Sequence, residues 1–407
     1  MVIRSIGAIR RLHFDRRAAA LANPDSHALE REIVVPLMIL SHSWGQHADI
    51  KKAIPVLVPA HLRRDFPGEG QYFVDHLAKL TSTRDELRAE IRKRMRAGDL
   101  LPHAPTALLH KPFVDLQNGG EIVAASPYFV RAIGRTGIWA RYLAGAKAQL
   151  GNRGGDEWSI AFGQMLEDWC RRYAKRAELA ARTDFRVELP SRPGAADEIE
   201  DVVTIEANAI AMFSVKSRLV REEIARHAIS RTKLLDWYEQ FFFTEKTAKH
   251  RVGVVAQLSN RIDMVRAGDF EPRVPRDVRI YPVLVTFDNL CDNQMLSEWL
   301  NGRCKVHGLL QQENVAPITL AVIDDYERLL AAPHQKRSVV ELLQSRSSPE
   351  LKNERLEVVL YGHEIEPRLP DTDAEYFALT NRVVQRLKSE EQPAPPPHNV
   401  PNQEVAT

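Results

Sequence analysis

The chain has 407 residues, of which 44% are hydrophobic and 27% charged, which is the composition of an ordinary soluble globular protein. That length is enough for two or three domains with a sizeable core. The formal charge of +2, from 56 basic and 54 acidic side chains, gives no argument for a nucleic-acid partner, although a local basic groove would be enough to bind one.

Cysteine usage and apolar runs exclude several other classes. Cys170, Cys291 and Cys304 have no CxxC spacing, which disfavours a zinc site or a disulfide scaffold and favours a cytoplasmic location. No apolar run is long enough to span a bilayer, so we expect no membrane partner. The basic start, MVIRSIGAIRRLHFDRR, has no continuous apolar stretch and predicts no secretory signal; an organellar transit peptide is the less favoured alternative.

Residues 1–150 predict a separate, mainly helical domain with some strands. A helical period runs through 73–102, with Asp85 and Glu86 near its start and Gly98 at its end. Two apolar stretches flank Asn118-Gly119-Gly120, which predicts a β-hairpin. We expect this domain to sense a target or a partner, but no motif in it names one.

The sequence predicts an α/β domain over residues 151–388, which begins with a loop at GNRGGD, 151–156. A helix is predicted over 157–182, because large apolar residues recur at the spacing of one buried stripe. The residues of this stripe are Trp158, Phe162, Met165, Leu166, Trp169 and Tyr173. Apolar runs then predict three strands, at 185–189, 199–205 and 210–216.

Helices and strands alternate in the rest of the chain. We predict helices within 219–266 and at 296–304, 324–331 and 336–345. We predict strands at 279–287, 316–323 and 354–362. The proline-rich end, 389–407, lacks core-forming residues and is predicted to be disordered.

A lysine ends the otherwise apolar strand IAMFSVKS, residues 210–217. Ser214 and Lys216 are two residues apart, so their side chains share one face of the strand. Asp201 lies near the start of the preceding strand, and antiparallel pairing would bring it to the same end of the sheet as Lys216. Lys216 is therefore either a solvated strand-end residue or one that is held for chemistry.

Glu167, on the flanking helix beside the apolar stripe, adds a second carboxylate. Two carboxylates and a lysine around one cleft form a hard-oxygen Mg²⁺ site with an adjacent cation. Such a site suits phosphodiester hydrolysis, because the metal polarises the phosphate and lowers the pKa of an attacking water. The lysine would position that water or stabilise the developing charge.

Asp201 and Glu167 also have ordinary structural explanations. Asp201 has other acids around it, namely Asp197, Glu198 and Glu200. Glu167 fits a solvated helix surface equally well, with Asp168 and Arg171 nearby for surface pairing.

The segments GQMLEDW, EIEDVV and MFSVKS, in this order, resemble the motifs of the restriction-endonuclease-like superfamily, the PD-(D/E)xK phosphodiesterases. The resemblance covers about a third of the chain and implies an α-β-β-β-α-β core, a mixed sheet flanked by helices. It implies Mg²⁺ or Mn²⁺ bound by Glu167, Asp201 and the backbone carbonyl of Val215, with Lys216 as the catalytic cation. The implied activity is metal-dependent cleavage of DNA, or of RNA, by a homodimer or with a partner protein, in prokaryotic anti-phage defence or DNA processing.

Ser214 departs from the family pattern, which has an acid at this position. Losing a carboxylate weakens a site whose affinity depends on the charge count. This departure leaves three alternatives. In the first, Glu167 completes the site; in the second, Glu206 or Glu188 substitutes from a neighbouring strand. In the third, the site is inactive and the fold serves as a nucleic-acid-binding or scaffold subunit. We favour the first alternative; an accidental match in an unrelated α/β protein is the remaining one.

A segment at 231–251 interleaves basic side chains with Trp237, Tyr238 and three phenylalanines. Its basic residues include the candidate phosphate contacts Arg231, Lys233, Lys246 and Lys249. Such a segment fits a nucleic-acid-binding arm, with cations for phosphates and aromatic rings for stacking. A packed helix with a charged outer face is the explanation that we favour. Gln257, on the next helix, matches a glutamine that some nucleases of the superfamily carry there.

Overall fold

The computed structural model describes thirteen parts of the chain, and the fold is described for these parts alone. They are residues 56–65, 70–96, 113–117, 122–124, 135–188, 200–207, 209–217, 231–244, 252–269, 277–287, 294–351, 353–366 and 369. No helix in these parts is both long enough and apolar enough to cross a lipid bilayer.

The N-terminal part contains a small mixed sheet with the strand order β1-β4-β3-β2. Its strands are β1 (Val56–Leu57), β2 (Thr81–Thr83), β3 (Phe113–Asp115) and β4 (Ile122–Ala124). Its helices are α4 (Pro59–Asp65), α5 (Gly70–Lys79) and α6 (Arg84–Arg96). The antiparallel pairing of β3 with β4 confirms the hairpin, whose turn residues 118–120 lie outside the described parts. Helix α6 confirms the helix expected within 73–102, because it begins at Arg84 with Asp85 and Glu86 in its first turn; β2 separates it from α5.

The C-terminal part is built on a five-stranded mixed sheet with the strand order β5-β6-β7-β8-β9. Its strands are β5 (Arg186–Glu188), β6 (Val202–Glu206), β7 (Ala209–Lys216), β8 (Arg279–Thr286) and β9 (Thr319–Val322). Strands β5, β6 and β7 form an antiparallel meander, whereas β8 and β9 add in parallel to β7. The structure is therefore mixed α/β, as the sequence predicts.

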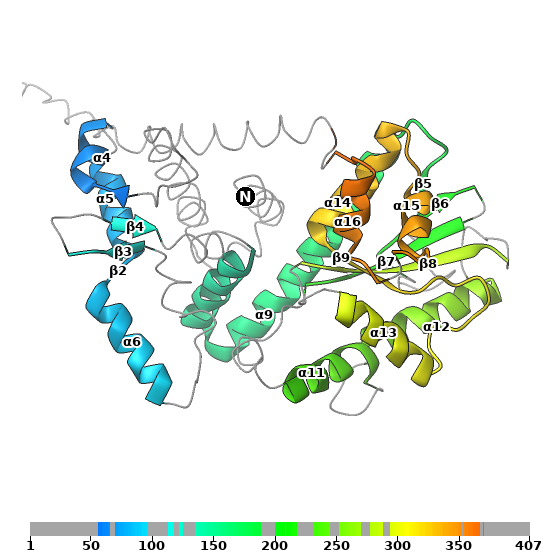
Figure 1. The fold of residues 1–407 in the computed structure, drawn as a ribbon, viewed down its shortest axis with the longest axis horizontal. Helices are drawn as coiled ribbons and strands as arrows, with labels where there is room; N and C mark the ends of the chain where they lie inside the picture. Colours follow the sequence, from blue (N-terminus) through cyan, green and yellow to red (C-terminus); the bar gives the residue numbers. More distant parts are fainter. Residues whose placement is uncertain are drawn as a thin grey trace, which may run out of the picture.

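Helices cover both faces of this sheet (Figure 1). One face packs against α9 (Arg135–Ala180), α14 (Ile323–Ala331), α15 (Val339–Arg346) and α16 (Leu356–Gly362). The other packs against α11 (Arg231–Phe243), α12 (Val254–Ala267) and α13 (Gln294–Val306). Alternate residues of β7 face the two layers: Phe213 and Val215 join the α9 layer, and Ile210 and Met212 join the α12 layer.

The predicted apolar stripe of α9 is confirmed, since each of its six large residues is buried. The expected loop at 151–156 is wrong, because α9 continues through it with a kink at Gly151 (φ 64°, ψ −150°). A Cβ atom on Gly154 would lie 2.2 Å from the carbonyl oxygen of Ala146, so the two helical segments meet too closely for a side chain. The domain limits at residues 150 and 388 stay predictions.

The strand predicted at 354–362 is also wrong, because these residues form helix α16. Leu356, Val359 and Leu360 are buried while Val358 and Tyr361 are exposed, which is the three-and-four spacing of a helix packed on one side. The adjacent valines favour a strand locally, but the single buried face selects the helix.

Candidate active site

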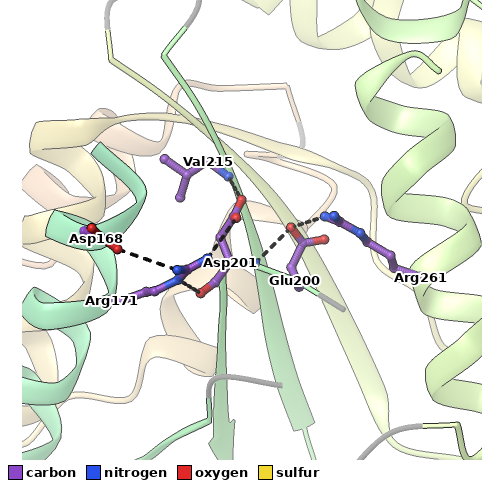
Figure 2. A network of polar contacts seen from close by, with 6 residues as sticks. All are labelled: Asp168, Arg171, Glu200, Asp201, Val215 and Arg261. Carbon is purple, nitrogen blue, oxygen red and sulfur yellow. Dashed lines mark hydrogen bonds and ion pairs between the residues drawn. The ribbon is translucent and has the colours of Figure 1, made fainter. Parts of the chain in front are cut away.

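Strands β6 and β7 bring Asp201 to the residues that end β7. Val202 pairs with Phe213, so Asp201, one residue earlier, lies beside Ser214. The backbone N–H of Val215 donates a hydrogen bond of 2.6 Å to Asp201 Oδ2 (Figure 2). Asp201 is thus tied to the residue between Ser214 and Lys216, as the expected antiparallel pairing requires.

Arg171, on α9, holds Asp201 from one side of the sheet (Figure 2). Its Nε donates to the carbonyl oxygen of Asp201 at 3.3 Å, and its Nη2 lies 3.7 Å from Asp201 Oδ1. Its Nη1 also lies 3.7 Å from Asp168 Oδ1. Asp201 is only 7% exposed, so its carboxylate is oriented by fixed donors and not by solvent.

Glu200, one of the acids that surround Asp201 in the sequence, is a member of this cluster. Its side chain is buried, and Arg261 Nη1 from α12 donates to its Oε1 at 2.6 Å. The backbone N–H of Asp201 donates to the same oxygen at 3.3 Å. Glu200 Oε2 has no hydrogen-bond partner within the described parts of the chain.

The pKa of Glu200 is raised from 4.5 to about 7. Burial is the largest cause, because it disfavours the charged carboxylate. Arg261 and Lys216 lower this pKa through their charges, and Asp201 raises it, so burial outweighs both cations. Glu200, Asp201, Lys216 and Arg261 therefore interact electrostatically as one group.

Lys216 is half-buried at the end of β7, beside Thr286 of the parallel strand β8. Its charge acts on Glu200, which places the ammonium group within electrostatic range of the carboxylates. Ser214 is fully buried, and its Oγ has no hydrogen-bond partner among the described residues.

Glu167 lies on the face of α9 that borders the site. Gly163, Glu167 and Arg171 follow one another at four-residue spacing and so share one helix face. A Cβ atom on Gly163 would lie 3.3 Å from Ser217 Oγ, just after β7, and Arg171 reaches Asp201. Glu167 lies between these two contacts, and its charge helps to raise the pKa of Arg261.

Of the two acids considered as substitutes, one lies at the opposite end of β6 and the other on the neighbouring strand β5. Glu206, at the opposite end of β6, accepts a hydrogen bond from Ser338 Oγ. It also accepts the backbone N–H groups of Val339 at 3.2 Å and Val340 at 2.9 Å, so it caps helix α15. Glu188 lies on the outer strand β5, opposite Val203. The expectation that Glu206 could complete the site is wrong, because α15 already uses its carboxylate.

The aromatic side chains of α11 are not available for base stacking. They are buried among α11, α12 and α13, and the residues are Trp237, Tyr238, Phe241, Phe242 and Phe243. This confirms the packed-helix explanation. Lys233 is exposed on α11, which begins at Arg231, whereas Lys246 and Lys249 lie outside the described parts. Gln257 donates through Nε2 to the carbonyl oxygen of Val252 at 2.8 Å, at the start of α12.

The donor set is suited to a hard divalent cation, but the carboxylates are not gathered around one point. Within the described parts, no group of three or more His, Cys, Asp or Glu side chains has an arrangement that could hold a metal ion. The acids Asp201 and Glu200 face Arg171 and Arg261 instead. The buried oxygens without partners, Glu200 Oε2 and Ser214 Oγ, are nevertheless the oxygen donors that Mg²⁺ and Mn²⁺ accept.

Comparison of this chain with protein-family models, with curated proteins and with solved structures found no match.

Proposed function

We propose that this chain is a metal-dependent nuclease that hydrolyses phosphodiester bonds in DNA. The observation that carries the proposal is the 2.6 Å hydrogen bond from the Val215 N–H to Asp201 Oδ2. It joins a buried carboxylate to the backbone beside Lys216, so an oxygen ligand and a cation lie at the same end of two neighbouring strands. Phosphodiester hydrolysis needs this pairing of an oxygen-rich cation site with a positive side chain.

The order of elements supports a restriction-endonuclease-like core. Helix α9 precedes the meander β5-β6-β7, and α12 leads into β8, which is parallel to β7. Among the described residues, two helices, α11 and α12, lie between β7 and β8, so the order agrees with the implied α-β-β-β-α-β core apart from one additional helix. The five-stranded sheet extends it by β9.

Four charged side chains have a role in this proposal. Asp201, Glu167 and the carbonyl of Val215 would hold Mg²⁺ or Mn²⁺, which polarises the scissile phosphate when it is bound. Lys216 orients the attacking water or stabilises the charge that develops on the phosphate. Arg171 is a positioning residue, since it holds both the backbone and the carboxylate of Asp201.

The cluster has no excess of negative charge, which suits an anionic substrate, because the raised pKa of Glu200 leaves this acid partly protonated near neutral pH. Three acids, Glu167, Glu200 and Asp201, lie near three cations, Arg171, Lys216 and Arg261. A bound divalent cation would make the site positive and attract the phosphodiester backbone. By its resemblance to the superfamily, the chain would act in the cytoplasm in anti-phage defence or DNA processing, as a homodimer or with a partner protein.

A catalytically inactive, DNA-binding or scaffold subunit is the second candidate function. The pairing of Asp201 with Arg171 and of Glu200 with Arg261 favours it, because arginines then satisfy the carboxylates that a metal would need. Ser214 favours it too, since it contributes no charge.

Cleavage of plasmid and single-stranded DNA with Mg²⁺ or Mn²⁺ tests the proposal. We expect the wild type to cut, and Lys216→Ala and Asp201→Asn to cut at least about 100-fold more slowly. Glu239→Gln is the matched control. Glu239 also accepts a hydrogen bond from an arginine, Arg303, but it lies on α11, away from the candidate site.

Equal cutting by the wild type and the Lys216→Ala variant would refute the catalytic role of Lys216. If the wild type is inert, Ser214→Glu decides between the two functions. Cleavage by this variant would identify a nuclease fold that has lost its metal ligand, and continued inactivity of the folded protein would favour the DNA-binding subunit.

A further inference from the structure

Two buried oxygen atoms at the ends of β6 and β7 lack hydrogen-bond partners within the described parts of the chain. They are Glu200 Oε2 and Ser214 Oγ, which flank Asp201 in the sequence and across the strand pair. Burying a polar atom without a partner costs free energy, and most such atoms in folded proteins have a partner. These two atoms therefore mark a place where a further group can bind.

Arg261 satisfies only one of the two carboxylate oxygens of Glu200. Its Nη1 lies 2.6 Å from Oε1, and Oε2 stays without a donor (Figure 2). The Glu200 side chain is 0% exposed, whereas that of Arg261 is 25% exposed. Arg261 is therefore the more exposed member of this pair, and its side chain is the part of the pair that solvent reaches.

We propose that Glu200 supplies the acid that position 214 lacks, and that Arg261 is its counter-ion until a divalent cation takes that place. The inference rests on the proposed function, because it completes the same cation site. Glu200 precedes Asp201 directly, and the Asp201 N–H donates to Glu200 Oε1, so the two carboxylates are held on one short segment. Glu200 and Asp201 would provide two charged ligands, and Ser214, which lies across the strand pair from Asp201, would provide a hydroxyl.

Calorimetric titration of the full chain with Mn²⁺ alone tests this assignment. We expect Glu200→Gln to weaken Mn²⁺ binding at least about tenfold, because the change removes one ligand charge. Glu239→Gln, a change of the same kind at a distant Glu–Arg pair, should bind as the wild type does. Arg261→Gln should bind at least as tightly as the wild type, because a competing cation is removed.

A rescue variant separates a ligand role from a structural one. Ser214→Glu in the Glu200→Gln background should recover at least about half of the lost binding free energy, since it returns an acid to the same end of β7. Thermal unfolding shows whether each variant is folded. If Glu200→Gln does not fold, Glu200→Asp keeps the charge but withdraws the carboxylate, and we expect weaker Mn²⁺ binding from it.

Wild-type Mn²⁺ affinity in folded Glu200→Gln or Glu200→Asp would overturn the inference. If the wild type nevertheless cleaves DNA with Mg²⁺, the proposed function stands and the role of Glu200 is refuted. If Mn²⁺ binding depends on Glu200 but no DNA is cleaved, the cation site stands and the nuclease function is refuted. A wild type that neither binds Mn²⁺ nor cleaves DNA refutes both.

Discussion

Replacing Glu200 by glutamine should change how the stability of the fold depends on pH. Burial raises the pKa of Glu200 from 4.5 to about 7. Between these values the folded protein keeps a proton that the unfolded chain has released. A rise in pH through this interval therefore destabilises the wild type relative to Glu200→Gln, which cannot titrate there. Below pH 4.5 and above pH 7 the difference is constant.

The size of the effect follows from the same two values. An interval from 4.5 to about 7, at about 1.4 kcal/mol for each pH unit, corresponds to about 3 kcal/mol. The carboxylate is fully buried, so solvent does not screen it. The pKa of about 7 already includes the opposing charges of Arg261 and Lys216.

Urea unfolding at intervals from about pH 5 to pH 8 measures the effect as the difference between wild type and Glu200→Gln. Glu239→Gln is the control. Partial burial acts to raise the pKa of Glu239, but hydrogen bonds from Arg303 and His307 outweigh it and lower the pKa. The Glu239 carboxylate is therefore ionised above pH 4.5, and any change in this control difference reports only His307, whose Nε2 lies 2.7 Å from Glu239 Oε1 and is charged only when protonated. A flat difference for Glu200→Gln would refute the reasoning, because Glu200 would then be ionised throughout.

Three further variants test the site and the packing around it. Lys216→Met should lower DNA cleavage at least about 100-fold in a gel assay. Its melting temperature should be nearly unchanged, because the side chain is half-buried at a strand end. A large loss of stability would indicate a structural lysine. Glu206→Gln should destabilise the fold by about 1–3 kcal/mol in urea, since the donors at the start of α15 lose their charged acceptor, and an unchanged midpoint would show that α15 does not need this cap. Phe242→Ala should cost about 3–5 kcal/mol, because the ring is fully buried between helices. The affinity of this variant for single-stranded DNA, measured by fluorescence anisotropy, should not change; a selective loss would revive the stacking role.

Local patterns predicted most of the secondary structure. The α9 stripe has the spacing of one buried helix face, and the central strands β6, β7 and β8 are nearly continuous apolar runs because both of their faces are buried. Prediction failed where local preference and packing disagree. Val358 and Val359 favour a strand locally. Only Val359 of the two is buried, together with Leu356 and Leu360, and this spacing is that of a helix with one buried face. Gly154 indicates a loop, but its missing side chain lets two helical segments meet.

The same distinction holds within the candidate site. Asp201 and Lys216 were predictable, because strand order and the two-residue alternation of β7 bring them to one end of the sheet. The assignments of Glu200 and Glu206 were not. Glu200 lies just before β6 and Glu206 ends it, so their sequence surroundings do not separate them. The partner of each is more than 60 residues away, on α12 for Glu200 and before α15 for Glu206.

The sequence by itself predicted the α/β class and the two strands that bring Asp201 and Lys216 to one end of the sheet, because these depend on neighbours along the chain. Only the tertiary structure decided that Glu200 is buried against Arg261 and that Glu206 caps helix α15. The reason is physical: the state of a buried carboxylate depends on how much solvent it loses and on which cation reaches it. For Glu200, the packing of α12 against the sheet sets both.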